Sequence, residues 1–289
     1  MKAKQWLVTV LAAGITITGI PFSGMEIHAQ TVGKDAKEKF SGQEWFDQNG
    51  VFEVNRSDAH ASFIGFDKEA SVKNPDTRKQ HEQSPYYKSL NGQWDFALVD
   101  SPFDIEEKGL QNFYASDYDM AGNAETWGKM QVPANWQSKE GGRVAAPKYT
   151  DTELPWLGVE DPRADYGLNY NSPRGISPTV YNPVGFYRNT FKTPEGWDGK
   201  EVFVSFQGVE SAFYVWVNGK KVGYSEDSYT AAEFDISSCL NAPGEDNTIA
   251  VQVFRWSDGS YLEDQDFIRM SGIFRDVFLF AKDKKEFSV

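Results

Sequence analysis

Short runs of large apolar residues, separated by Gly, Pro, Asn and Asp, make up most of the chain from Ser89 onward. The run 92–98 alternates apolar with polar or small residues, as a half-buried strand does. No long segment with helical periodicity separates these runs, so the pattern predicts an all-β sandwich, for which a jelly roll is the natural architecture. The other strands predicted in this way are 201–206, 233–236, 247–254 and 273–280.

A β-hairpin is the clearest local signal. Two β-rich runs within 212–224 flank Asn218-Gly219. Both residue types tolerate the positive φ angles of a type I′ turn, which joins two antiparallel strands tightly. The sequence therefore predicts a hairpin that turns at these two residues.

Two stretches lack periodicity. Residues 30–88 are polar with scattered charges, which favours an extended arm over a domain of its own. The stretch from Val132 to Phe186 is rich in Pro, Gly, Asn and Tyr. Because long irregular loops in compact domains usually have a function or contact other parts, we expect ligand or domain contacts there.

The beginning of the chain has the features of a secretory signal peptide. Lys2 and Lys4 precede an apolar run that extends to about Ile20, and Ala29 is a small residue at a suitable cleavage position. The alternative is a membrane anchor, but threonines and glycines leave the run short and only moderately apolar. We expect residues 1–29 to be removed and the protein to be exported to the periplasm or the extracellular space, with no membrane contact afterwards.

Composition narrows the partners and the chemistry. A net charge of −13 and a pI near 4.8 argue against a nucleic-acid partner, which needs a basic face. The single cysteine, Cys239, excludes an internal disulfide and is expected to pack as a small apolar residue. Of three histidines, His28 lies in the predicted leader, so a three-histidine metal centre is not expected.

Several sequence blocks, in a fixed order between Ser89 and Val277, carry a family resemblance. Each block alone is short, but their number, order and spacing are specific. The chain resembles the N-terminal sugar-binding domain of family 2 glycoside hydrolases, and among them the β-galactosidases of the bacterial lac type. The blocks are Ser89-Leu90-Asn91-Gly92-Gln93-Trp94, Val132-Pro133-Ala134-Asn135-Trp136-Gln137, Gly185-Phe186-Tyr187-Arg188, 213–219, 223–228, 255–266 and 270–277.

The resemblance implies a galactose-binding-like jelly roll over 89–283 that packs beside a catalytic (β/α)₈ barrel and forms one wall of its galactose pocket. The retaining reaction needs two carboxyl groups, which the family carries in the barrel, so no catalytic residue is expected in this chain. Residues 284–289 resemble the start of an immunoglobulin-like domain. We therefore expect a β-galactosidase fragment that is inactive alone.

Two residues match family positions that contact sugar. Asp266 matches an aspartate that ligates sodium and contacts galactose, and Asp151 stands where lac-type enzymes have an asparagine. An ionised carboxylate accepts hydrogen bonds but cannot donate them as an amide does, which puts the role of Asp151 in question. The resemblance also implies that the sodium site is incomplete here, that any magnesium is bound through ligands outside this chain, and that the full enzyme is a homo-oligomer.

Other residues have plainer interpretations. The acids Glu263 and Asp264, and the pair Glu106 and Glu107, are expected to lie on solvated faces. Trp94 and Trp216 are expected in the core, whereas Trp136 and Trp156 are candidates to face a ligand or another domain. Two alternatives to the β-galactosidase fragment remain, namely a free-standing carbohydrate-binding module and an assembly fragment without hydrolase activity.

Overall fold

The structure is a computed structural model that describes residues 40–46, 51–61, 63–67, 80–150, 182–263 and 265–284. All of them belong to one compact unit, Glu38–Val289. Within these ranges the one α-helix is α3 (Gly259–Leu262), and the remaining helical turns are the short 3₁₀ segments η2 (Gln80–Gln83), η3 (Pro102–Asp104), η4 (Glu195–Trp197) and η5 (Ser237–Cys239). The all-β prediction is confirmed. The predicted leader and Trp156 lie outside the described residues, and the described part contains no helix long and apolar enough to cross a membrane.

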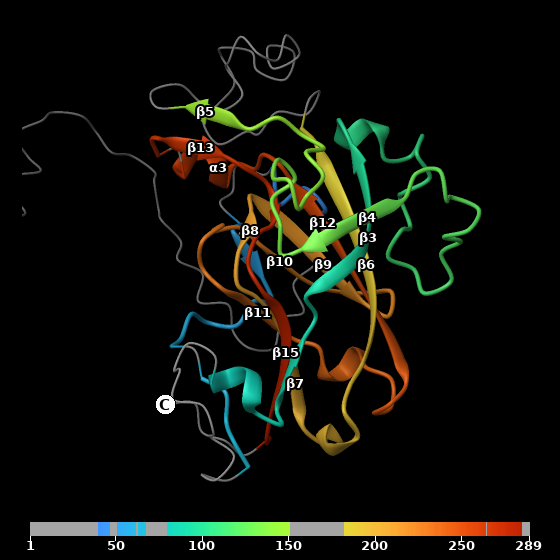
Figure 1. Ribbon diagram of the computed structural model, residues 1–289, viewed down its shortest axis with the longest axis vertical. Coiled ribbons are helices and arrows are strands. Elements are labelled where there is room, and N and C mark those ends of the chain that lie inside the picture. The colour runs from blue at the N-terminus through green and yellow to red at the C-terminus, as the bar shows by residue number, and fades with distance from the viewer. Residues whose placement is uncertain are drawn as a thin grey trace, which may run out of the picture. The chain divides into compact units, whose positions relative to one another are not determined.

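Two antiparallel sheets form the sandwich (Figure 1). The jelly-roll connectivity itself stays a prediction. The larger sheet has the order β1 (Glu53–Val54), β10 (Lys220–Ser225), β9 (Ala212–Val217), β12 (Asp246–Phe254), β6 (Val184–Lys192), β3 (Gly92–Val99) and β4 (Gly128–Val132). The smaller sheet has the order β11 (Ala232–Asp235), β7 (Glu201–Phe206), β15 (Val277–Lys282) and β2 (Tyr87–Ser89). Two short ribbons pair β13 (Phe267–Arg269) with β5 (Lys148–Thr150) and β14 (Gly272–Ile273) with β8 (Val209–Glu210).

The predicted hairpin is present. Strands β9 and β10 are antiparallel and turn at Asn218 and Gly219, whose φ angles are 50° and 77°. The Asn218 side chain also receives a hydrogen bond from Thr248 N of the neighbouring strand β12, at 2.8 Å. The turn is thereby tied to the middle of the larger sheet.

The larger sheet is buried on both faces. Its inner face packs against the smaller sheet through residues such as Tyr187, Val215 and Phe206, which share one apolar cluster. Its outer face is covered by two segments far apart in sequence, which contribute Trp45 and Phe113 to a second cluster. Burying a large apolar side chain is worth about 1.5–3 kcal/mol, so both faces contribute to stability.

The beginning of the described chain is held on that outer face by one buried acid. Glu44 is 3% exposed, and its carboxylate accepts hydrogen bonds from Tyr214 and from the backbone of Ser41 and Gly42. Burial opposes ionisation, but these hydrogen bonds outweigh it and lower the pKa of Glu44. Next to it, the Trp45 ring stacks on Phe254 of β12 with centroids 4.5 Å apart.

Trp136 lies in the core, which corrects the expectation that it faces a ligand or another domain. Its side chain is 0% exposed, and its indole N–H donates to the Tyr187 hydroxyl. Gly185 and Gly272 make room for the ring, since a Cβ at either position would lie 2.4 Å or 2.8 Å from it. Trp94 and Trp216 are also buried, as expected, and Cys239 packs half-buried against the core.

Replacing Trp136 with alanine is expected to destabilise the chain by about 3–5 kcal/mol, because it opens a cavity between the sheets and removes the hydrogen bond from the indole N–H to the Tyr187 hydroxyl. Urea unfolding followed by far-ultraviolet circular dichroism measures the change. Phe103→Ala is the control, because Phe103 is 71% exposed and its truncation is expected to cost about 0.5 kcal/mol or less. Equal effects of the two substitutions would contradict the assignment of Trp136 to the core.

His60 joins the arm to the edge of the smaller sheet. Its Nδ1 lies 2.8 Å from the Ala61 carbonyl oxygen and its Nε2 lies 2.9 Å from a carboxylate oxygen of Glu233 on β11. Only the doubly protonated imidazolium can donate to both acceptors. The hydrogen bond to Ala61 and, after it, the interaction with Glu233 raise the pKa of His60, against the effects of partial burial and of the Lys282 charge.

The arm contact is therefore expected to weaken as the pH rises. A histidine whose folded-state pKa lies above its unfolded value of about 6.5 stabilises the fold fully below that value and stops doing so above the folded-state pKa. Amide exchange of residues 57–61 in the intact chain and in His60→Gln, compared at each pH, measures this. The wild type is expected to be better protected at low pH only. A difference that does not change with pH would contradict the prediction, and His81→Gln is the control.

Candidate functional site

The β5–β13 ribbon carries the residues that the sequence points to. Its register pairs Phe267 with Thr150, Ile268 with Tyr149, and Arg269 with Lys148. Figure 1 shows the two strands side by side at one end of the sandwich, next to α3. Two segments far apart in the chain thus meet where the predicted sugar contacts begin.

Asp266 directly precedes β13 and is exposed. Its Oδ1 accepts a hydrogen bond of 2.6 Å from the Tyr149 hydroxyl of β5, 117 residues away in the chain. Asp151 directly follows β5 and lies outside the described residues. In the register of the ribbon, Phe267, which follows Asp266, nevertheless lies opposite Thr150, which precedes Asp151.

Buried arginines hold the ribbon on the sandwich. Arg269 is 2% exposed, its guanidinium lies 4.2 Å from the centroid of the Phe267 ring, and its Nη2 donates to the Gln265 carbonyl oxygen at 3.3 Å. From the end of β12, Arg255 donates to the Ala146 carbonyl oxygen, two residues before β5, at 2.8 Å. Both strands of the ribbon are thus anchored by cations under the surface.

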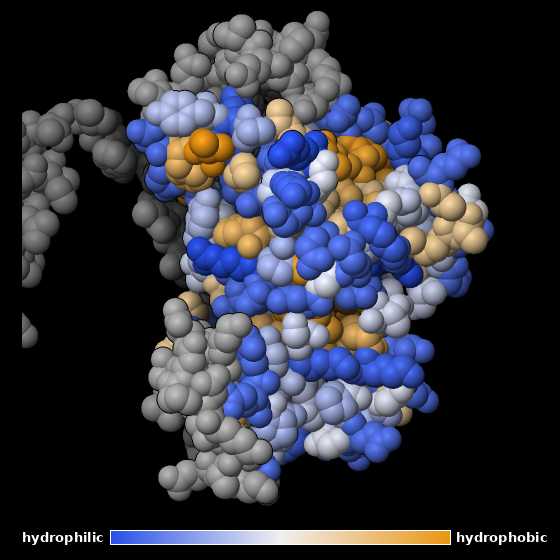
Figure 2. Space-filling model, viewed as in Figure 1, coloured by the Kyte–Doolittle hydropathy of each residue, from blue (hydrophilic) through white to orange (hydrophobic). Residues whose placement is uncertain are grey.

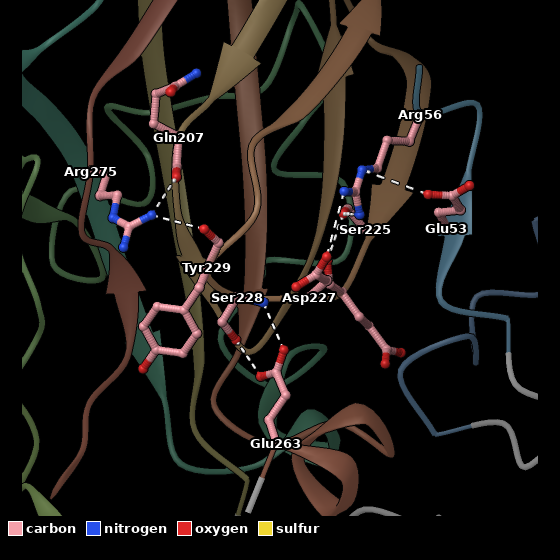
Figure 3. Close-up of polar contacts among 10 residues, drawn as sticks. Glu53, Arg56, Gln207, Ser225, Asp227, Ser228, Tyr229, Glu263 and Arg275 are labelled. Atoms are coloured by element: carbon pink, nitrogen blue, oxygen red, sulfur yellow. Dashed lines mark hydrogen bonds and ion pairs between the residues drawn. The ribbon is translucent and has the colours of Figure 1, made fainter. Parts of the chain in front are cut away.

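Glu263 differs from the solvated acid expected at this position. Its two carboxylate oxygens accept hydrogen bonds from Ser228 N at 2.8 Å and Ser228 Oγ at 2.7 Å, as Figure 3 shows. Burial raises its pKa, although the bonds from Ser228 oppose this. Glu263 therefore fastens the segment before Asp266 to the loop after β10. The other expected acidic face, Glu106 and Glu107, is exposed as predicted.

Arg275 holds the next residue of the same loop, Tyr229. Its Nη1 donates to the Tyr229 carbonyl oxygen at 2.8 Å and to the Gln207 carbonyl oxygen at 3.4 Å (Figure 3). The Tyr229 ring packs edge-on against Phe267 with centroids 6.0 Å apart. The loop is consequently held at two adjacent residues, Ser228 and Tyr229, and the Tyr229 ring packs against β13.

Two further buried acids lie behind this corner, and no sequence pattern distinguishes them from ordinary strand residues. Glu210 on β8 is 5% exposed, and burial raises its pKa to about 8 despite the nearby charge of Arg269. Glu226, after β10, accepts a hydrogen bond from Tyr224, and burial followed by repulsion from Asp258 raises its pKa. Both carboxyls are therefore expected to be largely protonated at neutral pH.

An apolar rim surrounds Asp266. Tyr149, Leu262 and Ile268 are 60%, 82% and 56% exposed, and Tyr149 and Ile268 are paired across the ribbon. In Figure 2 an orange patch bordered by blue lies at the corner where Figure 1 places β13 and α3. Exposed apolar residues gathered beside an exposed carboxylate are typical of a surface that another part of a protein covers.

Asp266 is the one metal ligand that the sequence analysis expects in this chain. No group of three or more His, Cys, Asp or Glu side chains within the described residues is arranged to hold an ion. Sodium prefers several oxygen ligands, and the ribbon offers it the carboxylate of Asp266. The described part of the chain could thus supply one of the several oxygen ligands that a sodium ion needs.

A family model and the similarity to curated proteins assign the chain to the same protein family. The model for the sugar binding domain of glycosyl hydrolases family 2 matches residues 87–283. The chain belongs to glycoside hydrolase family 2. The matched residues include the ribbon that carries Asp266 and every strand of both sheets except β1.

Curated relatives in this family are β-galactosidases. The chain is 44% identical to the β-galactosidase of Priestia megaterium over 239 residues, which are 82% of this chain and 20% of that enzyme. It is 36% identical to the β-galactosidase large subunit of Leuconostoc lactis, over 83% of this chain and 35% of that subunit. The chain therefore spans about a fifth to a third of the length of these relatives.

Among solved structures, Bacteroides uniformis β-glucuronidase 2 bound covalently to cyclophellitol-6-carboxylate aziridine aligns with a TM-score of 0.44 and 22% identity. The alignment covers 68% of this chain and 18% of that one.

Replacing Glu210 with glutamine is expected to flatten the pH dependence of stability. Between the unfolded-state pKa of about 4.5 and the folded-state pKa of about 8, the folded protein keeps a proton that the unfolded chain has lost. Wild-type stability should therefore fall as the pH rises through this range, by about 1.4 kcal/mol for each unit of pKa shift at most. Urea unfolding between pH 5 and pH 9 measures both slopes. The exposed control Glu107→Gln should keep the wild-type slope of the free energy of unfolding against pH. If Glu210→Gln kept this slope as well, the raised pKa of Glu210 would be refuted.

Proposed function

We propose that this chain is the sugar-binding part of a β-galactosidase that hydrolyses terminal non-reducing β-D-galactosides. The observation that carries the proposal is the β5–β13 ribbon, which holds an exposed carboxylate, Asp266, beside the chain position that leads into Asp151. Asp266 contributes to the wall of the galactose pocket and accepts hydrogen bonds from sugar hydroxyls. Similarity to curated β-galactosidases over 82% of the chain supports the choice of substrate.

The rest of the pocket and the chemistry come from the catalytic part of the complete enzyme. Retaining hydrolysis needs an acid/base carboxyl and a nucleophilic carboxylate about 5 Å apart. We assign neither role to this chain. The exposed apolar rim formed by Tyr149, Leu262 and Ile268 supports the proposal that the catalytic part covers this corner and completes the pocket.

Sodium, assembly and export belong to the same proposal. Asp266 provides one oxygen ligand to a sodium ion, which neutralises part of its charge beside the sugar. The complete enzyme is a homo-oligomer, and any magnesium is bound through ligands outside this chain. Export follows from the charged and apolar beginning of the sequence, and it places the activity in the periplasm or outside the cell.

Asp266→Ala is expected to lower kcat/KM for a chromogenic β-galactoside by about 10–100-fold, because hydrogen bonds to a charged group are each worth about 1.5–3 kcal/mol. The measurement mixes this chain with Priestia megaterium β-galactosidase that lacks its matching segment, with sodium present. The chain alone should be inactive. Asp246→Ala is the matched control, since Asp246 is an exposed aspartate at the beginning of β12, where it pairs with Lys192.

Two results would contradict the proposal. The first is turnover by the chain alone, which would mean that it contains its own catalytic pair. The second is a truncated Priestia enzyme that regains activity when mixed with its own missing segment but stays inactive when mixed with the wild-type chain. Galactose binding by the isolated chain in that case would favour a free-standing carbohydrate-binding module.

A further inference from the structure

We propose that Tyr149 is a positioning residue for Asp266, whose carboxylate it holds in one orientation toward the galactoside. The inference rests on the proposed function, because it assigns a role in the same pocket. It starts from the hydrogen bond of 2.6 Å that Tyr149 donates to Asp266 Oδ1. A charge-assisted bond from a hydroxyl to a carboxylate is short and among the stronger hydrogen bonds of proteins.

The register of the ribbon makes this contact specific. Ile268 lies directly opposite Tyr149, so Asp266, two residues earlier, is the diagonal neighbour of Tyr149 on the same face. Diagonal neighbours across antiparallel strands are within reach of a long aromatic side chain. A shift of the register by one residue would move Tyr149 to the opposite face and remove the bond.

Tyr149 has little influence on the folding of the ribbon. Its side chain is 60% exposed, whereas Arg269 on the partner strand is 2% exposed. Removal of the Tyr149 hydroxyl should therefore leave the sandwich intact. A loss of function would then report on Asp266 and not on unfolding.

Orientation matters because Asp266 is exposed, so packing does not fix its carboxylate. With Oδ1 held by Tyr149, the Oδ2 atom is directed consistently and keeps its lone pairs for a sugar hydroxyl or a cation. Without the bond, the carboxylate has to be ordered when the substrate binds, which costs affinity. The bond should also strengthen when the covering part of the enzyme excludes water.

Tyr149→Phe keeps the ring and removes the hydroxyl. In the reconstituted enzyme we expect KM for the galactoside to rise about five- to tenfold, which matches the loss of one hydrogen bond. In an Asp266→Asn background, Tyr149→Phe should change KM much less, because the carboxylate on which it acts is absent. Tyr86→Phe is the control, since Tyr86 directly precedes β2 of the smaller sheet and its ring centroid lies 4.6 Å from the ammonium of Lys200, which directly precedes β7.

A second measurement uses the chain alone and does not depend on activity. In the protein labelled with ¹³C at tyrosine Cζ, the Tyr149 resonance is identified by its loss in Tyr149→Phe. It should shift in Asp266→Asn if the bond exists in solution. An unchanged resonance overturns the inference, whatever the reconstituted enzyme does.

The kinetic outcomes separate this inference from the function on which it rests. Loss of activity in Asp266→Asn but full activity in Tyr149→Phe would retain the galactose pocket and refute the positioning role. Additive effects of the two substitutions would mean that Tyr149 contacts the sugar directly and would also refute it. Inactivity of the wild-type mixture, with the Priestia segment active in parallel, would refute the function itself.

Discussion

Burial of the larger sheet on both of its faces is the constraint on which the rest of the structure depends. Every residue of β9 is buried, as are most residues of its neighbour β12. The smaller sheet covers one face, and the other face is covered by segments around Trp45 and Phe113. An antiparallel sheet usually leaves one face to solvent, so these covering segments are part of the fold and not accessory loops.

The same core determines where the candidate site lies. Trp136 fills the space over Gly185 and Gly272, and its backbone N–H donates to the Ser271 carbonyl oxygen at 2.9 Å. Before Ser271 the chain passes through Met270 to Arg269, the last residue of β13 in the ribbon. Asp266 is thus exposed and yet only a few residues away from the buried core.

Local sequence patterns predicted the strands that alternate or that flank a clear turn, including the fully buried β9, but they missed β6. The alternating run that became β3 and the Asn218-Gly219 hairpin were predicted from local chemistry alone. Strand β6 was not, because Val184 and Phe186 face one apolar cluster while Tyr187 and Phe191 face the other. Asp266 was found through family resemblance, whereas the burial of Glu210 and Glu263 depends on tertiary contacts that no local pattern encodes.

The buried acids behind the ribbon bear on how Asp266 works. An ionised carboxylate beneath the ribbon would be costly to bury and would add negative charge behind the exposed Asp266. Burial instead raises the pKa of Glu210 to about 8, against the opposing effect of the nearby Arg269 charge. Glu210 is therefore largely neutral at neutral pH and adds no buried negative charge behind the exposed carboxylate of Asp266. This arrangement keeps the buried side of the corner free of an unpaired carboxylate, whose cost would grow once water is excluded.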